Sequence, residues 1–330
     1  MKAMTVHESM SRARNAFRIG DYAQAEALAL GVLQQKKRLP EVHNFLGTVY
    51  GRLGDHARAV QEFKKAIELR PRYAEAYNNL GVTLKNLQRF EGAEAAFHKA
   101  LGLAPDRADI HYNLGNVYKG SGREEQAIRE FLKAQELDPS FVPTYNNLGT
   151  SYENLGRQAE AVAVYRRGLE ADSNSPTLHY NLGLALKREG LLSEARGEFI
   201  QALRGRPGWA EALTNLGVVL QLQGNAQEAL RAFLQVLRVQ PDNAQAYNNV
   251  GVAYAQLGRA SDAAQAYREA LKRDPAYYQA VANLASLLES EKRYSEALEE
   301  LERLTALDPD NPEARFRLAV CYLNLDRDQE

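Results

Sequence analysis

The chain has 330 residues, of which 45% are hydrophobic and 25% charged, as in an ordinary globular protein. Its 41 Lys and Arg residues balance its 42 Asp and Glu residues, which argues against a general nucleic-acid binder, because such proteins need a basic surplus. A single cysteine, Cys321, excludes an internal disulfide framework and a multi-cysteine metal site. The chain has neither a signal-like segment nor a long apolar run. We therefore expect a cytoplasmic protein that does not enter the membrane.

A short motif around Leu-Gly recurs along the chain in steps of 34 residues. The glycine of the motif, or an alanine in its place, falls at Gly47, Gly81, Gly115, Gly149, Gly183, Gly217, Gly251, Ala285 and Ala319. With this residue as position 8, the predicted divisions are a lead (1–5), nine full units (6–39, 40–73, 74–107, 108–141, 142–175, 176–209, 210–243, 244–277, 278–311) and a partial tenth unit (312–330). A fixed period without insertions predicts a repeat protein rather than two globular domains.

Each unit has the pattern of two helices joined by a turn, here called the A helix and the B helix. Small or apolar residues fall at positions 4, 7, 8 and 11 and again at 20, 24, 27 and 28, which is helical spacing. Glycine at position 15 and proline at position 32 recur where the two helices are expected to end. One hairpin cannot bury its apolar face alone, so the hairpins are expected to stack into an all-α solenoid.

These columns resemble the tetratricopeptide repeat family, whose pattern is an aromatic residue at position 4, Leu at 7, Gly at 8, Tyr at 11, Ala at 20, Phe at 24, Ala at 27 and Pro at 32. The resemblance covers residues 6–330, although the first unit departs from it with Arg12 at position 7 and Ala29 at position 24. The resemblance implies a right-handed α-solenoid whose A helices line a concave groove. It also implies a non-catalytic role in binding a protein or peptide.

Position 6 lies opposite the apolar stripe of the A helix on a helical wheel, so it is expected to be exposed. It is nevertheless asparagine in seven successive units: Asn79, Asn113, Asn147, Asn181, Asn215, Asn249 and Asn283. These seven residues are called the asparagine ladder. An amide can donate and accept hydrogen bonds, so the ladder could hold the backbone of an extended peptide. It resembles the ladder in the repeat domain of O-linked N-acetylglucosamine transferases. Hydrogen bonds between repeats, or recent duplication, would also produce it.

Basic residues near the end of several A helices are further candidates for peptide binding. They are Lys85, Lys119 and Lys187 at position 12, and Arg18, Arg52 and Arg188 at position 13. In the groove they would favour an acidic or phosphorylated segment. The alternative is that they are solvated side chains at its rim.

No catalytic constellation or cofactor site is predicted. His43, His111 and His179 occupy position 4 and are two units apart, too far to share a metal ion. Cys321 falls at a small packing position and is expected to be buried.

Two alternatives to a peptide-binding scaffold remain open. The chain could be the substrate-docking region of a larger enzyme, such as an O-linked glycosyltransferase, since the tenth unit has no B helix. It could also be a self-assembling scaffold, because residues 1–110 carry 17 basic and 12 acidic groups while residues 221–330 carry 12 and 17.

Overall fold

The computed structural model describes residues 5–327, and the described side chains end at Leu325. The predicted lead 1–5 therefore lies outside the described residues except for Thr5, as does the end of the last predicted unit, 328–330. Within the described part the chain is all-α, with 19 helices and no strand. None of these helices is long and apolar enough to cross a membrane.

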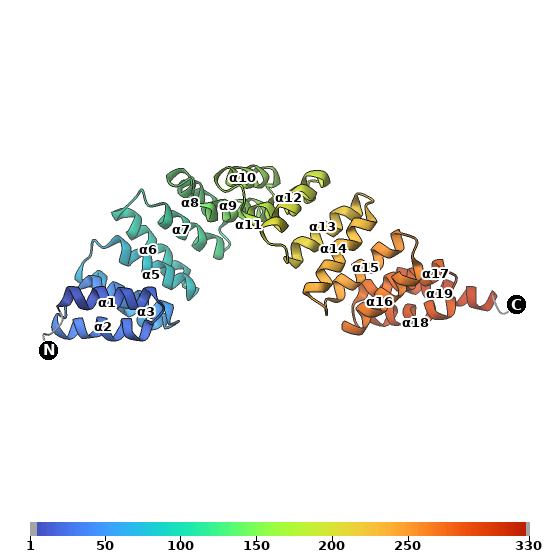
Figure 1. The fold of residues 1–330 in the computed structure, drawn as a ribbon, viewed down its shortest axis with the longest axis horizontal. Coiled ribbons are helices and arrows are strands. Elements are labelled where there is room, and N and C mark those ends of the chain that lie inside the picture. Colours follow the sequence, from blue (N-terminus) through green and yellow to red (C-terminus); the bar gives the residue numbers. More distant parts are fainter. Residues whose placement is uncertain (1–4, 328–330) are drawn as a thin grey trace. The chain divides into compact units, whose positions relative to one another are not determined.

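The helices form two compact units, one ending at Asp172 and the other beginning at Ser173. The first unit contains α1 (Val6–Arg18), α2 (Tyr22–Gln35), α3 (Pro40–Arg52), α4 (His56–Leu69), α5 (Ala74–Asn86), α6 (Phe90–Leu103), α7 (Ala108–Gly120), α8 (Glu124–Leu137), α9 (Val142–Asn154) and α10 (Gln158–Ala171). The second contains α11 (Pro176–Arg188), α12 (Leu192–Gly205), α13 (Ala210–Leu222), α14 (Ala226–Val239), α15 (Ala244–Gln256), α16 (Ala260–Arg273), α17 (Tyr278–Ser290), α18 (Tyr294–Leu307) and α19 (Pro312–Arg327). Odd-numbered helices are A helices and even-numbered helices are B helices. Within each unit, successive hairpins lie beside one another in chain order (Figure 1).

Local sequence signals explain where the helices begin. Thr5 starts α1 with a capping box: its hydroxyl accepts from the Glu8 N–H at 3.2 Å, and the Glu8 carboxylate accepts from the Thr5 N–H at 2.8 Å. Asp21 and Asp55 cap α2 and α4 with their carboxylates. Pro40 stands in the first turn of α3, where a missing N–H costs nothing.

The turn between the A and B helices requires a left-handed backbone at position 15. Seven repeats place glycine there, with φ between 71° and 85°. Two repeats instead place Gln88 and Lys292 at the same position, each with φ of 57°. A side chain in this region costs roughly 1 kcal/mol relative to glycine, so these two turns are locally strained.

The core of most repeats depends on one close approach between the two helices of a hairpin. The ring at position 24 lies directly over the glycine at position 8, so that a Cβ on Gly115 would stand 2.6 Å from the Phe131 ring. In the ninth repeat the same two positions hold Ala285 and Leu301, both fully buried. The larger residue at position 8 is thus matched by a smaller one at position 24.

Alanine at position 20 completes this packing. It is 0% exposed in all nine full repeats: Ala25, Ala59, Ala93, Ala127, Ala161, Ala195, Ala229, Ala263 and Ala297. The thiol of Cys321 is also buried, as predicted, and donates to the Tyr294 carbonyl at 3.3 Å.

We expect Gly115→Ala to destabilise the protein by about 2 kcal/mol, because the new methyl group overlaps the Phe131 ring. The same change in an open helix would stabilise by up to about 1 kcal/mol. In a Phe131→Leu background, which copies the pairing of Ala285 with Leu301, the penalty should disappear. Thermal and urea denaturation of the four proteins in this double-mutant cycle measure the coupling. Additive effects would contradict the packing argument.

We expect Gln88→Gly and Lys292→Gly each to stabilise the protein by about 1 kcal/mol, because glycine adopts positive φ without strain. The matched control is Gln223→Gly, at a turn residue whose φ is −84° and which gains nothing from glycine. The midpoint of thermal unfolding should rise for the first two variants only. A rise for all three, or for none, would show that the strain is absent.

Candidate functional site

The seven residues of the asparagine ladder lie on the A helices α5, α7, α9, α11, α13, α15 and α17, and all seven are half-buried. The expectation from the helical wheel that they are exposed is therefore wrong. A wheel treats one helix alone, but within each unit the A helices of neighbouring repeats also contact one another. Part of each packed A-helix face is consequently covered by the preceding repeat.

In the first unit the ladder amides donate hydrogen bonds to the preceding repeat. Asn79 Nδ2 donates to Asn44 Oδ1 at 3.1 Å, and Asn113 Nδ2 donates to Asn78 Oδ1 at 3.2 Å. Each pair joins position 6 of one repeat to position 5 of the repeat before it. These bonds fix the orientation of the ladder amides before any ligand arrives.

Asn147 uses both of its N–H groups in the same way. It donates to the Tyr112 hydroxyl at 3.1 Å and to Asn116 Oδ1 at 2.7 Å. The side-chain oxygen of Asn147, Oδ1, makes no hydrogen bond with a described residue, so this oxygen is the part of the amide left for a ligand.

The second unit repeats the arrangement with more variation. Asn283 Nδ2 donates to Asn248 Oδ1 at 2.9 Å, as in the first unit. Asn215 donates to the Tyr180 hydroxyl at 3.4 Å and to the Glu211 carbonyl at 2.9 Å. Asn181 also has a polar partner. The side chain of Asn249 forms no hydrogen bond with the described residues.

The predicted basic residues differ in how strongly they are held. The ammonium group of Lys119 donates to the Thr150 hydroxyl of the next A helix, and that of Lys187 donates to Asn215 Oδ1 at 2.6 Å. Burial lowers the pKa of Lys119, against the opposing charges of Glu124 and Glu153. These two lysines therefore connect adjacent A helices rather than standing free at a rim.

Two of the other four predicted cations, Lys85 and Arg188, are placed differently. Lys85 is half-buried, and its ammonium group makes no ion pair or hydrogen bond within the described part of the chain. Arg188 is exposed and already has an interaction partner. Burial, and then the charge of Arg188, lower the pKa of Lys187.

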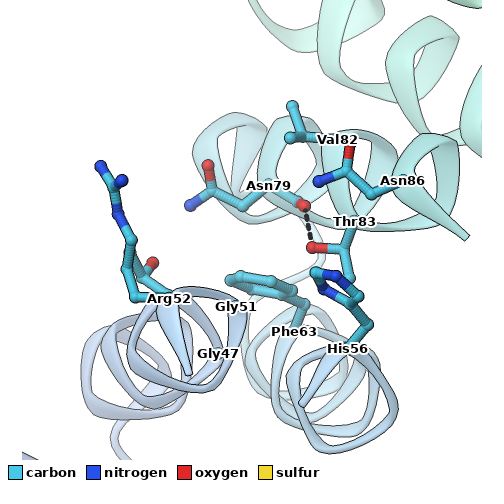
Figure 2. Close-up of a pocket in the computed structure, with 10 residues that line it drawn as sticks. Gly47, Gly51, Arg52, His56, Phe63, Asn79, Val82, Thr83 and Asn86 are labelled. Carbon is cyan, nitrogen blue, oxygen red and sulfur yellow. Dashed lines mark hydrogen bonds between the residues drawn. The ribbon is translucent and has the colours of Figure 1, made fainter. Parts of the chain in front are cut away.

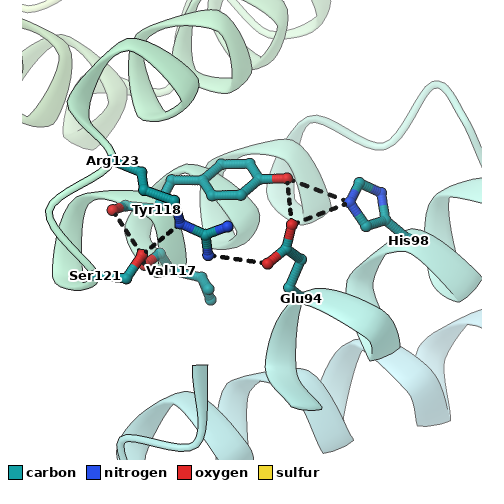
Figure 3. Close-up of polar contacts among 6 residues, drawn as sticks. All are labelled: Glu94, His98, Val117, Tyr118, Ser121 and Arg123. Atoms are coloured by element: carbon teal, nitrogen blue, oxygen red, sulfur yellow. Dashed lines mark hydrogen bonds and ion pairs between the residues drawn. The ribbon is translucent and has the colours of Figure 1, made fainter. Parts of the chain in front are cut away.

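A polar cluster that the sequence pattern did not predict joins repeats away from the ladder. The Tyr118 hydroxyl donates to Glu94 Oε1 at 3.0 Å and lies 3.2 Å from His98 Nε2. Arg123 donates to the other oxygen of Glu94 at 2.9 Å and stacks on the Tyr118 ring (Figure 3). The cluster therefore ties α6 to the next hairpin. Tyr50 does the same for α3 by donating to Glu26 of α2 at 2.9 Å.

The position-4 histidines have carboxylate partners that the sequence could have indicated. Nδ1 of His43, His111 and His179 lies 2.6–2.7 Å from a glutamate oxygen, and the partners are Glu62, Glu130 and Glu198. Each glutamate follows its histidine by 19 residues. These pairs join the A and B helices of single hairpins, and no group of three or more potential metal-ligating residues occurs in the described part of the chain.

The stacked hairpins define a helical repeat protein. Comparison with family models identifies the repeat family to which it belongs. Models described as "Tetratricopeptide repeat" match residues 72–140, 180–238, 214–278, 254–306 and 288–330. A model described as "TPR repeat" matches residues 47–88 and 154–190. The chain belongs to the tetratricopeptide repeat family, whose typical role is protein–protein interaction.

Two solved structures show the same fold. The C-terminal part of a TPR repeat-containing protein from Cytophaga hutchinsonii is 17% identical, with a TM-score of 0.63 over 74% of this chain and 99% of that chain. PilF from Pseudomonas aeruginosa is 22% identical, with a TM-score of 0.54 over 66% and 96%. YrrB, described as a TPR protein with an unusual peptide-binding site, is 30% identical over 57% and 96%, with a TM-score of 0.49. No curated protein sequence matches the chain.

We expect alkaline pH to destabilise the folded protein through three of its tyrosines. Burial, followed by the hydrogen bond to a glutamate, raises the pKa of Tyr50 and of Tyr118 to about 12, and burial alone raises that of Tyr267 to about 12. The ordinary value is about 10. A raised folded-state pKa gives stability that is present below pH of about 10 and is lost as the pH rises through about 12.

Near-ultraviolet absorbance and circular dichroism, followed together against pH, measure this effect. Three tyrosines should ionise only as helicity falls. In the variant Tyr118→Phe this number should be two. Ionisation of every tyrosine near pH of about 10, with helicity unchanged, would contradict the assignment.

Proposed function

We propose that this tetratricopeptide repeat protein is a non-catalytic scaffold that binds an extended segment of a partner protein through the asparagine ladder on its A helices. The observation that carries the proposal is that the ladder amides are half-buried and that five of them, Asn79, Asn113, Asn147, Asn215 and Asn283, donate hydrogen bonds to the preceding repeat. Their orientation is set by bonds to the preceding repeat, so a ligand does not have to order them. Pre-ordered groups bind more tightly because less conformational entropy is lost on association.

The atoms that remain available suit a peptide backbone. Asn79, Asn113 and Asn283 each retain a carbonyl oxygen and one N–H group. An extended segment presents backbone N–H and C=O groups at regular intervals, and neutral amides bond both without regard to the ligand's side chains. We assign a smaller part to Asn215, because its oxygen already accepts from Lys187 and both of its N–H groups are used.

Charge on the same face supports a ligand that carries acidic groups. Lys85 has no acidic partner in the described part of the chain, and Lys119 bonds only to a hydroxyl group. An ammonium group retains further donors after one such bond. We therefore favour an acidic extended segment over a basic one.

We expect Asn113→Ala to bind peptide about fivefold more weakly, since a hydrogen bond of about 1 kcal/mol to the peptide backbone is lost. The probe is a 15-residue peptide selected by the 330-residue protein from a displayed random library, with affinity measured by fluorescence anisotropy.

The matched control is Asn78→Ala. It breaks the same bond between repeats but keeps the ladder amide of Asn113. Both variants should lose similar thermal stability, whereas only the first should lose affinity. Equal affinities of the two variants would remove the ladder from the binding site.

A further inference from the structure

A pocket of about 320 Å³ lies on the A-helix face of the first unit, between α3, the start of α4 and α5. The Phe63 ring and the His56 imidazole lie at its base, with Arg52 on one side and Asn79 and Asn86 on the other (Figure 2). Its volume is about ten times that of one water molecule in the liquid, so it can accept a side chain.

The pocket exists because one repeat lacks a side chain that other repeats have. Position 12 is Gly51 in the second repeat, and lysine in three others. In two of these, Lys119 and Lys187, the lysine reaches the next A helix and bonds to it. Gly51 lines the pocket but has no side chain that could fill it. The space that a lysine could fill is thus left open on this face of the chain.

The lining of the pocket has polar groups that lack partners. Nδ1 of His56 is buried and has no hydrogen-bond partner in the described structure. A buried polar atom without a partner is costly, and a bound group that satisfies it gains that free energy. Arg52 and Asn86 are exposed, and their side chains form no hydrogen bond or ion pair with the described residues.

The pocket lining carries positive charge and no negative charge. Arg52 lines it, and none of its lining residues is acidic. Asp55, which precedes His56, is already engaged by the Arg58 guanidinium at 2.6 Å and by the Arg58 N–H. A negatively charged group is therefore the complement that the protein itself does not supply.

We propose that this pocket binds the side chain of a glutamate in the extended segment, with its carboxylate among Arg52, Asn86 and His56. Its methylene groups lie against the Phe63 ring and Val82, which supply the apolar part of the lining. An apolar side chain would leave His56 Nδ1 unpaired, and a lysine would face Arg52. The proposal rests on the proposed function, because it names the side chain that the peptide-binding face reads.

The decisive variant is Gly51→Lys, which should fill the pocket with a chain that other repeats tolerate at the same position. A Cβ at Gly51 meets no atom within 4 Å, so the substitution fits without a clash. Replacing a helical glycine should also raise the midpoint of thermal unfolding. A loss of binding in a more stable protein cannot be attributed to unfolding. Gly51→Ala is the matched control, since it gives the same helix effect and leaves most of the pocket open.

The first probe is glutamate capped as N-acetyl-Glu-N-methylamide, added to the full chain and followed by nuclear magnetic resonance of the Asn79 and Asn86 side-chain amides. These signals should shift in the wild type and in Gly51→Ala, and not in Gly51→Lys or Arg52→Gln. The capped glutamine and lysine compounds should cause little shift. Equal shifts with glutamine, or none with glutamate, would overturn the assignment.

The second probe separates this inference from the proposed function. Peptides selected from the displayed library should be enriched in glutamate and should bind Gly51→Lys about tenfold more weakly. If they are sensitive to Asn113→Ala but not to Gly51→Lys, the pocket assignment fails and the ladder stands. If the capped glutamate shifts the pocket signals but no peptide is selected, the ladder fails and the pocket stands.

Discussion

The contact on which the rest of the structure depends is the ring at position 24 resting on the glycine at position 8. A single added methyl group at Gly149, for example, would stand 2.2 Å from the Tyr165 ring. This contact sets how closely the two helices of a hairpin approach, and a fully buried alanine at position 20 allows the same approach. Where glycine gives way to Ala285, the ring gives way to Leu301. In these repeats a larger residue at one of the two positions is therefore accompanied by a smaller one at the other.

Tight apolar packing inside each hairpin leaves the contacts between A helices to polar side chains. Within each unit these contacts are amide–amide, amide–hydroxyl and lysine–oxygen hydrogen bonds. At the last A helix, α19, the contact is made by a cation of the later repeat: Arg317 donates to Ser286 and forms an ion pair with Glu289. Polar groups that are held in place but only half-buried can serve two purposes, because they join neighbouring repeats and still present atoms to a ligand.

Differences between the repeats then decide where the protein could recognise a particular side chain of the ligand. The hairpin scaffold tolerates glycine, lysine, glutamate, glutamine or alanine at position 12. Lysine at this position closes the space between two A helices in two repeats, and Gly51 opens it. A backbone-binding ladder with such openings would combine general affinity for an extended chain with local selectivity for its side chains.

The sequence by itself determined the repeat, the two helices of each hairpin and the buried columns, because these follow from periodic patterns and from contacts within one hairpin. It also placed Cys321 in the core. Only the tertiary structure decided that the ladder amides are half-buried, that Lys119 and Lys187 connect adjacent A helices, and that a pocket opens at Gly51. The physical reason is that these features depend on how far the side chains of one repeat reach into the next. A helical wheel of a single helix contains no information about its neighbour.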